Sequence, residues 1–247
     1  MLNLEAKVFG DKTSEIGSYG GLKTRISYRL NVIHQKLSKF LVIRYIGYLL
    51  PFSPFRGIIW RVLDKNSRSY LDVGCAKGGT GLVLRMHGCK AFVVGADLYL
   101  PYLEELKSKK IYDGLVYCDA RHLPFKEKSF DVVLAIEVIE HLSKDEGLNF
   151  LKKAEEIASR QVVITTPVGF MKMFHKNLKP IENELQEHKS GWLPEEFKEL
   201  GYRVRGEYGP SFLPRDMAYW LSFILPLTYF IPTMSYCMIC TKRRKDK

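Results

Sequence analysis

Several features that would assign this sequence to a class at once are missing from it. The 247 residues include five cysteines, and Cys237 and Cys240 have no second CxxC pair that would complete a zinc site. An odd, low cysteine count is typical of reduced thiols in an intracellular protein rather than of a disulfide framework. Neither repeats nor low-complexity segments occur, and no residue spacing predicts a metal site. The N-terminus lacks an apolar run of signal-peptide length.

Acidic residues are comparatively scarce in the two flanks of the chain. The sequence carries 38 Lys and Arg against 27 Asp and Glu, a net charge of +11. Residues 1–68 hold 12 basic and 4 acidic side chains, residues 69–169 hold 13 and 14, and residues 170–247 hold 13 and 9. Basic flanks around a nearly neutral middle indicate an anionic partner, such as lipid head groups, nucleic acid or an acidic substrate.

Charge is missing altogether between Asp216 and Lys242, over a length that could span a bilayer. Pro226 and Pro232 would interrupt a helix there. We therefore favour a short apolar helix, a proline turn and a last strand at Ser235–Thr241 over a membrane-spanning helix. Contact with a membrane surface is compatible with either interpretation.

Short apolar runs alternate with helix-like stretches from residue 69 onward. The expected strands are Tyr70–Val73, Ala91–Ala96, Leu115–Cys118, Asp131–Ile136, Val162–Thr165 and Tyr202–Gly206. This alternation is typical of βαβ units in a parallel sheet, where ligands bind at the carboxyl ends of the strands. Before it, residues 22–64 predict an amphipathic helical segment with a basic side, broken by Pro51 and Pro54.

The loop after the first expected strand is rich in glycine, with Gly74, Gly78, Gly79 and Gly81 close together. Glycines between a strand and an apolar helix let the backbone turn sharply and approach a ligand, which predicts nucleotide binding. Asp72 lies just before the turn, where it would repel a phosphate and attract a cation. S-adenosylmethionine, an adenosine ligand with a cationic amino acid part, therefore fits better than NAD.

Further acidic residues follow the next strands. Asp97 ends the second strand and can accept hydrogen bonds from ribose hydroxyls. Asp119 follows the third strand, and with the backbone amide of Ala120 it suits an adenine ring. Glu137 comes at the carboxyl end of the fourth strand. Three acids at successive strand ends after a glycine loop indicate a binding site rather than unrelated surface charges.

The motifs DVGCAKGG, GADL, CDARHLPF, SFDVVLAIEVIEHL and VVITTP resemble, in this order, those of the class I S-adenosylmethionine-dependent methyltransferases that act on small molecules, lipids and quinones. The resemblance is strong over about residues 69–169 and loose over 185–241. It implies an α/β fold, a Rossmann-like three-layer sandwich with a seven-stranded, mostly parallel sheet and an antiparallel last strand. Residues 1–68 are then a basic helical extension or cap, and 69–247 the cofactor-binding domain, with a substrate-side insertion at 169–200.

The same resemblance implies the cofactor contacts, and S-adenosylmethionine is the implied cofactor. The implied residues are Asp72, Gly74 and Gly78 around the methionine part, Asp97 at the ribose, Asp119 and Ala120 at the adenine, Glu137 along the pocket, and Cys75 and Leu98 as further contacts. Ala76 departs from the family pattern, which usually has its middle glycine there.

Two histidines are candidate general bases. His141 follows the fourth strand and His188 lies in the insertion beside Trp192. Imidazole titrates near neutral pH and can take a proton from an acceptor. The favoured alternative for His141 is an orienting hydrogen bond, and for His188 a loop anchored by Trp192. A base is needed only if the acceptor starts protonated, because methyl transfer depends largely on proximity and alignment.

We therefore expect a methyltransferase that moves a methyl group to a small-molecule or lipid-like acceptor by in-line displacement. We expect a cytoplasmic protein, peripheral to an anionic membrane surface. An RNA methyltransferase is the first alternative, less favoured because neither an RNA-binding module nor an Asn/Asp-Pro-Pro-Tyr/Phe motif is recognised. A non-enzymatic membrane-associated protein is the second, and a nicotinamide-dependent oxidoreductase is least favoured. The sequence does not indicate the acceptor atom or the oligomeric state.

Overall fold

The computed structural model describes residues 57–171, 183–211 and 227–244. Most of the predicted amphipathic extension, the middle of the predicted insertion (172–182) and the apolar residues 217–226 lie outside these ranges. Within the described ranges, no helix has both the length and the apolar character needed to cross a bilayer.

The elements alternate between strands and helices as the sequence predicts. In chain order they are α3 (Gly57–Val62), β1 (Ser69–Val73), α4 (Gly79–Met86), β2 (Phe92–Asp97), α5 (Leu100–Lys109), β3 (Gly114–Tyr117), η1 (Ala120–His122), β4 (Phe130–Ile136), η2 (Ile139–His141), α6 (Lys144–Ile157), β5 (Ala158–Pro167), η3 (Glu184–Gln186), α7 (Pro194–Glu199), β6 (Arg203–Pro210), α9 (Leu227–Phe230), η4 (Pro232–Met234) and β7 (Ser235–Arg243). Each expected strand is present, with ends that differ from the prediction by a few residues. The last expected strand is β7.

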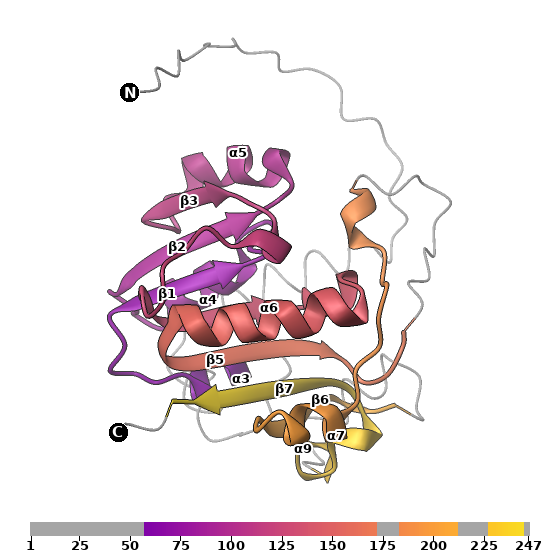
Figure 1. Cartoon of the computed structure of the whole chain (residues 1–247). Helices are drawn as coiled ribbons and strands as arrows, with labels where there is room; N and C mark the ends of the chain where they lie inside the picture. Colours follow the sequence, from indigo (N-terminus) through magenta and orange to yellow (C-terminus); the bar gives the residue numbers. More distant parts are fainter. Residues whose placement is uncertain (1–56, 172–182, 212–226, 245–247) are drawn as a thin grey trace, which may run out of the picture. The chain divides into compact units, whose positions relative to one another are not determined.

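The strands form one seven-stranded sheet in the order β3-β2-β1-β4-β5-β7-β6 (Figure 1). Neighbours among β1 to β5 run parallel. In contrast, β7 is antiparallel to both β5 and β6. The predicted mostly parallel sheet with an antiparallel last strand is therefore confirmed. The strand order reverses between β1 and β4, and the carboxyl ends of these two strands mark the place where ligands bind in such sheets.

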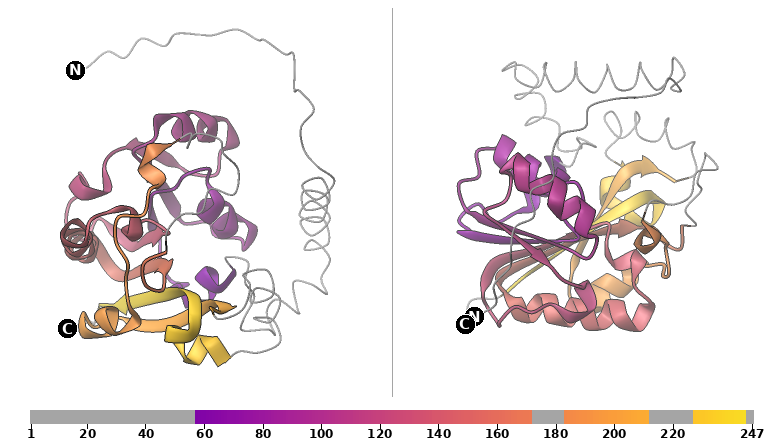
Figure 2. Two further views of the ribbon diagram at one scale, coloured as in Figure 1. Left: turned by 90° about the vertical axis from the view of Figure 1, so that its right-hand side faces the viewer. Right: turned by 90° about the horizontal axis from the view of Figure 1, so that it is seen from above.

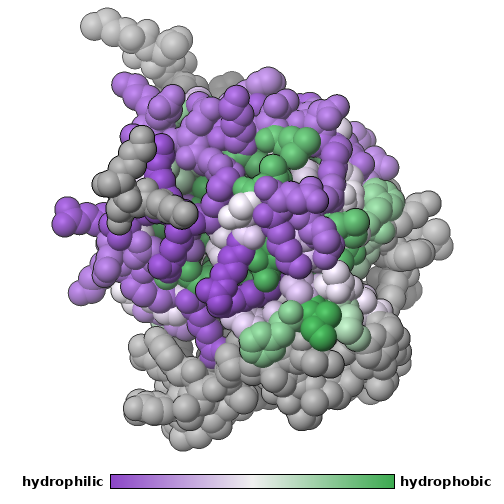
Figure 3. Space-filling view, turned by 60° about the horizontal axis from the view of Figure 1, so that its bottom comes forward, coloured by the Kyte–Doolittle hydropathy of each residue, from purple (hydrophilic) through white to green (hydrophobic). Residues whose placement is uncertain are grey.

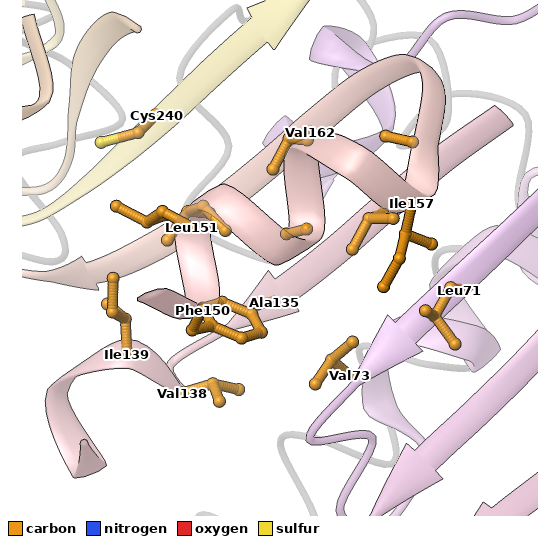
Figure 4. Packing of buried hydrophobic residues seen from close by; sticks show 14 of the residues in the cluster. Leu71, Val73, Ala135, Val138, Ile139, Phe150, Leu151, Ile157, Val162 and Cys240 are labelled. Carbon is orange, nitrogen blue, oxygen red and sulfur yellow. The ribbon is translucent and has the colours of Figure 1, made fainter. Parts of the chain in front are cut away.

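Helices cover both faces of the sheet and make three layers (Figure 2). On one face lies α6, whose Phe150 and Ile157 pack with Leu71 of β1 and Ala135 of β4 (Figure 4). On the other face, Ile59 of α3 and Leu84 of α4 pack against β4. Because β4 is buried on both sides from Val132 to Ile136, this part of the strand is apolar throughout rather than alternating. Helix α3 thus contributes to the core of the sheet, although it lies within the stretch predicted as the extension.

A capping box sets the start of α6. The Ser143 hydroxyl accepts from the backbone amide of Glu146 at 3.4 Å, and the Glu146 carboxylate accepts from the Ser143 amide at 2.8 Å. Two amides of the first turn that have no partner within the helix are satisfied in this way. The capping box fixes where α6 begins, so the connection from β4 is short. It contains η2.

Candidate functional site

The loops that follow β1 and β4 touch one another. Gly74, directly after β1, has a φ of +67°, and a Cβ at this position would collide with the side chain of Val138, which comes after β4. Glycine meets both requirements, because it adopts positive φ readily and leaves the space open. The glycine loop and the end of the central strand therefore meet where the strand order reverses.

The glycine loop turns through three residues in the left-handed region: Gly74, Ala76 at +45° and Gly78 at +84°. The amides of Gly74 and Cys75 donate to the Ala96 carbonyl at 2.8 and 3.0 Å. Ala76 thus occupies the conformation for which glycine is usual, at a cost of about 1–2 kcal/mol for a residue with a Cβ. The departure from the family pattern is accommodated in the backbone of this one residue.

Asp97 anchors the same loop from the end of β2. Its Oδ2 accepts from the Ala76 amide at 2.8 Å and its Oδ1 from the Tyr99 amide at 2.8 Å. A carboxylate has about four acceptor positions, so Asp97 retains capacity to accept from ribose hydroxyls. Leu98, which lies between Asp97 and Tyr99 in the chain, is half-buried.

Asp72 lies beneath the loop and is fully buried. Its Oδ2 accepts a 2.5 Å hydrogen bond from the Tyr112 hydroxyl, which in turn accepts from the Gly81 amide in the first turn of α4, at 3.2 Å. Burial, and then the charge of Asp72, raise the pKa of Tyr112 well above its ordinary value. Tyr112 therefore links the end of β1 to the start of α4. Sequence reasoning missed Tyr112, because no local pattern distinguishes it from a core tyrosine, and the cationic contact of Asp72 stays a prediction.

Cys75 also points away from a ligand placed above the loop. Its side chain is buried and packs in a small cluster with Leu103 and Leu106 of α5. Burial raises the pKa of the thiol far above its usual range, so the thiol stays protonated. Only the backbone of Cys75 belongs to the loop surface.

Asp119 caps η1 and is paired with Arg121. Its carboxylate accepts from the Arg121 amide at 2.8 Å and from the Arg121 guanidinium at 2.6 Å. The hydrogen bonds from Arg121 lower the pKa of Asp119. Arg121 reaches on to Glu146 at 3.1 Å. The predicted contact of Asp119 and Ala120 with an adenine stays a prediction, and Arg121 competes for the same carboxylate oxygens.

Glu137 stands at the carboxyl end of β4 in a strained conformation, with a φ of +58°. Its amide donates to the Thr165 carbonyl at 3.0 Å, and the Thr165 hydroxyl donates to its Oε1 at 2.9 Å. A residue with a side chain is held in this region only where its surroundings enforce it, which is frequent at binding sites. The strain supports the prediction that Glu137 lines a ligand pocket.

The two candidate bases lie together. The rings of His141 and His188 are 4.9 Å apart between centroids and nearly perpendicular, at 75°. The amides of Lys189 and Ser190 donate to the Glu140 carbonyl at 2.8 and 3.1 Å, which fastens the insertion to η2. Burial lowers the pKa of both imidazoles below the ordinary value. The orienting hydrogen bond expected for His141 exists, since its Nδ1 lies 3.1 Å from the Glu187 carbonyl.

These positions place acidic residues around the glycine loop, at the carboxyl ends of the neighbouring strands β2, β1 and β4. Asp97 and Glu137 are half-buried there, and Asp72 is fully buried. A pyrophosphate would meet repulsion there, whereas a sulfonium or an ammonium group would be attracted. These carboxylates therefore fit an adenosine ligand that carries positive charge and no phosphate.

Comparison with known proteins agrees with this geometry. Residues 71–163 match the model of a methyltransferase domain. The chain is 27% identical over 172 residues to ajmaline N-methyltransferase of Rauvolfia serpentina, which covers 66% of this chain and 53% of that protein. It is 29% identical over 131 residues to norajmaline N-methyltransferase of the same plant, covering 50% and 42%. The chain thus spans about half the length of these curated relatives.

A solved structure shows the same fold. The crystal structure of an S-adenosylmethionine-dependent methyltransferase from Thermotoga maritima superposes with a TM-score of 0.53 at 16% identity, over 90% of this chain and 99% of that one. Residues 71–163 thus match a methyltransferase domain, and the chain has the fold of solved S-adenosylmethionine-dependent methyltransferases.

Proposed function

We propose that this chain transfers a methyl group from S-adenosylmethionine to a small-molecule or lipid-like acceptor. One observation carries the proposal: the glycine loop and the Asp97 carboxylate meet at the point of strand reversal, within the matched domain. The bound cofactor supplies an electrophilic methyl group on a sulfonium. Asp97 orients the ribose, and the backbone of residues 74–78 holds the amino acid end.

Beyond binding the cofactor, the protein must hold the acceptor in line with the methyl group. Methyl transfer is an in-line displacement, and the attacking atom must lie behind the methyl group on the axis of the breaking bond. The segment that carries His188 and Trp192 is fastened to η2 after β4, on the side of the sheet where the loops gather. This segment is therefore suited to hold an acceptor near the cofactor.

Apolar side chains beside this segment support an organic acceptor. Phe170, Leu185 and Leu193 are exposed to 62%, 42% and 49% of their surface. Exposed apolar side chains that gather in one region can mark a ligand-binding site. The two plant relatives are named for N-methylation of norajmaline and ajmaline.

A peripheral, cytoplasmic position at an anionic membrane surface stays a prediction. The basic stretch on which it depends lies mostly outside the described residues. On the face shown in Figure 3, hydrophobic residues form separate groups between hydrophilic ones. Such groups are as consistent with contacts to a small ligand as with a lipid surface.

The cofactor site is tested by calorimetric binding of S-adenosylmethionine. Asp97→Asn keeps one carbonyl that can accept from the loop amide but removes the charge. We expect a loss of about 10- to 100-fold in affinity, since a hydrogen bond to a charged group contributes about 1.5–3 kcal/mol. Asp145→Asn, an exposed aspartate in the first turn of α6, is the matched control and should bind as wild type. Equal affinities for both variants would refute the assignment of Asp97.

The acceptor class is tested with methyl-labelled cofactor in a fractionated lysate. Label in the small-molecule or lipid fraction supports the proposal. Label in RNA would favour the RNA methyltransferase instead. Saturable cofactor binding without label in any fraction would favour a non-enzymatic protein that keeps the fold.

A further inference from the structure

A cluster of titratable side chains lies outside the proposed cofactor contacts. We call Glu140, His141 and His188 the histidine cluster, because one ligand atom from each lies within 4.8 Å of the others. Glu140 and His141 belong to η2, and His188 follows η3. The cluster joins two segments that are far apart in the chain, and no residue spacing in the sequence predicts it.

The protons on the two imidazoles can be placed from their partners. His141 Nδ1 lies 3.1 Å from the Glu187 carbonyl oxygen, and His188 Nδ1 lies 2.7 Å from the Met171 carbonyl oxygen. A carbonyl only accepts, so each Nδ1 carries the proton, and Nε2 of the neutral ring keeps a lone pair. Histidines that bind metals through Nε2 commonly hold Nδ1–H on a backbone carbonyl in this way.

Glu140 supplies an independent indication of a ligand. It is only 2% exposed, and its Oε2 has no hydrogen-bond partner among the residues that the structure describes. Burial of a carboxylate without a partner is costly. A cation beside this oxygen would supply the missing partner.

The cluster is also rigidly supported. The Glu140 carbonyl accepts the two amides of Lys189 and Ser190. The Ser190 hydroxyl donates to the Ile139 carbonyl at 3.3 Å and accepts from the indole of Trp192 at 2.9 Å, and Trp192 is fully buried. These contacts hold the ring of His188 against that of His141 before any ligand arrives. Such preorganisation reduces the entropic cost of binding an ion.

We propose that the histidine cluster binds a divalent transition metal ion of the zinc type, through the Glu140 carboxylate and the Nε2 atoms of His141 and His188. Two imidazoles and one carboxylate suit zinc and its neighbours better than magnesium or calcium, which prefer oxygen ligands alone. Three protein ligands leave a coordination position open, as in zinc sites that act on a bound molecule. An oxygen or nitrogen of the methyl acceptor fits that position. This last role rests on the proposed function, whereas metal binding does not.

The experiment uses the full chain, freed of metal with a chelator and titrated with Co²⁺ and then Zn²⁺. We expect one ion per chain, seen as cobalt absorption in the visible range that zinc displaces. His141→Ala, His188→Ala and Glu140→Gln should each weaken binding by at least about 100-fold, because loss of a ligand exceeds the 10–100-fold effect of losing a supporting contact. His122→Ala removes an exposed histidine outside the cluster and should change nothing.

Two outcomes would overturn the proposal: wild-type protein that binds neither ion, or cluster variants that bind as tightly as wild type. Circular dichroism of each variant shows whether it is folded, and the isosteric Glu140→Gln guards against collapse of the alanine variants. Binding of S-adenosylmethionine, measured in parallel, separates the two proposals. Cofactor binding without metal binding refutes only the metal site, and metal binding without cofactor binding refutes only the proposed function.

Discussion

Replacing Tyr112 with phenylalanine removes a single oxygen atom from beneath the glycine loop. That oxygen donates a 2.5 Å hydrogen bond to the buried carboxylate of Asp72 and accepts from the Gly81 amide at 3.2 Å. A hydrogen bond to a charged group contributes about 1.5–3 kcal/mol, and the amide that loses its acceptor adds to the loss. We therefore expect the Tyr112→Phe variant to lose about 2–4 kcal/mol of unfolding free energy.

The assay is equilibrium unfolding in urea, in which the midpoint should fall while the slope stays constant. Tyr117→Phe is the matched control, because Tyr117 is 60% exposed, and it should change stability by less than about 0.5 kcal/mol. If Tyr112→Phe were as stable as this control, the buried link between β1 and α4 would contribute nothing, and the argument for it would be wrong. Because the link supports the loop, affinity for S-adenosylmethionine should also decrease.

Three further predictions concern the backbone and the capping box. Gly74→Ala should destabilise the protein by about 2–5 kcal/mol in urea unfolding, because it adds both left-handed strain and a collision with Val138. Ala76→Gly should keep stability within about 1 kcal/mol of wild type, since relief of strain opposes the higher entropy of the unfolded chain. Hydrogen bonds to Ser143 lower the pKa of Glu146 from 4.5 to about 2, so its contribution to stability is complete above the unfolded pKa and is lost as the pH falls through the folded one. Between pH 5 and pH 2, the free energy of unfolding should accordingly fall less steeply in Glu146→Gln than in wild type. Urea unfolding at a series of pH values measures it.

The sequence predicts the sheet well because each buried strand is a short run of apolar residues that can be recognised without its neighbours. The run Val132–Ile136 is apolar on both faces, as a central strand requires, and the structure places the expected strand Asp131–Ile136 as β4 with one additional residue. Asp97 and Asp119 could be assigned to one edge, because parallel strands present their carboxyl ends together. These inferences need only the pattern of apolar residues along the chain and the direction of the strands.

Contacts between distant segments could not be predicted in this way. The partner of Asp72 is 40 residues away, and it is identified only once β3 has docked beside β2. His141 and His188 were separate candidates in the sequence, and backbone hydrogen bonds to Glu140 bring them together. Such pairings depend on tertiary hydrogen bonds between loops, which leave no periodic pattern.

The place of β7 in the sheet has a consequence for the order of assembly. It follows β6 in the chain, yet it lies between β5 and β6 and pairs with both. During synthesis on the ribosome, the edge of β5 that faces away from β4 has no native partner until residues 235–243 have emerged. An unpaired apolar strand edge can pair with the same edge of another nascent chain. Pairing of β7 with β5 is thus a step before which newly made molecules are open to aggregation.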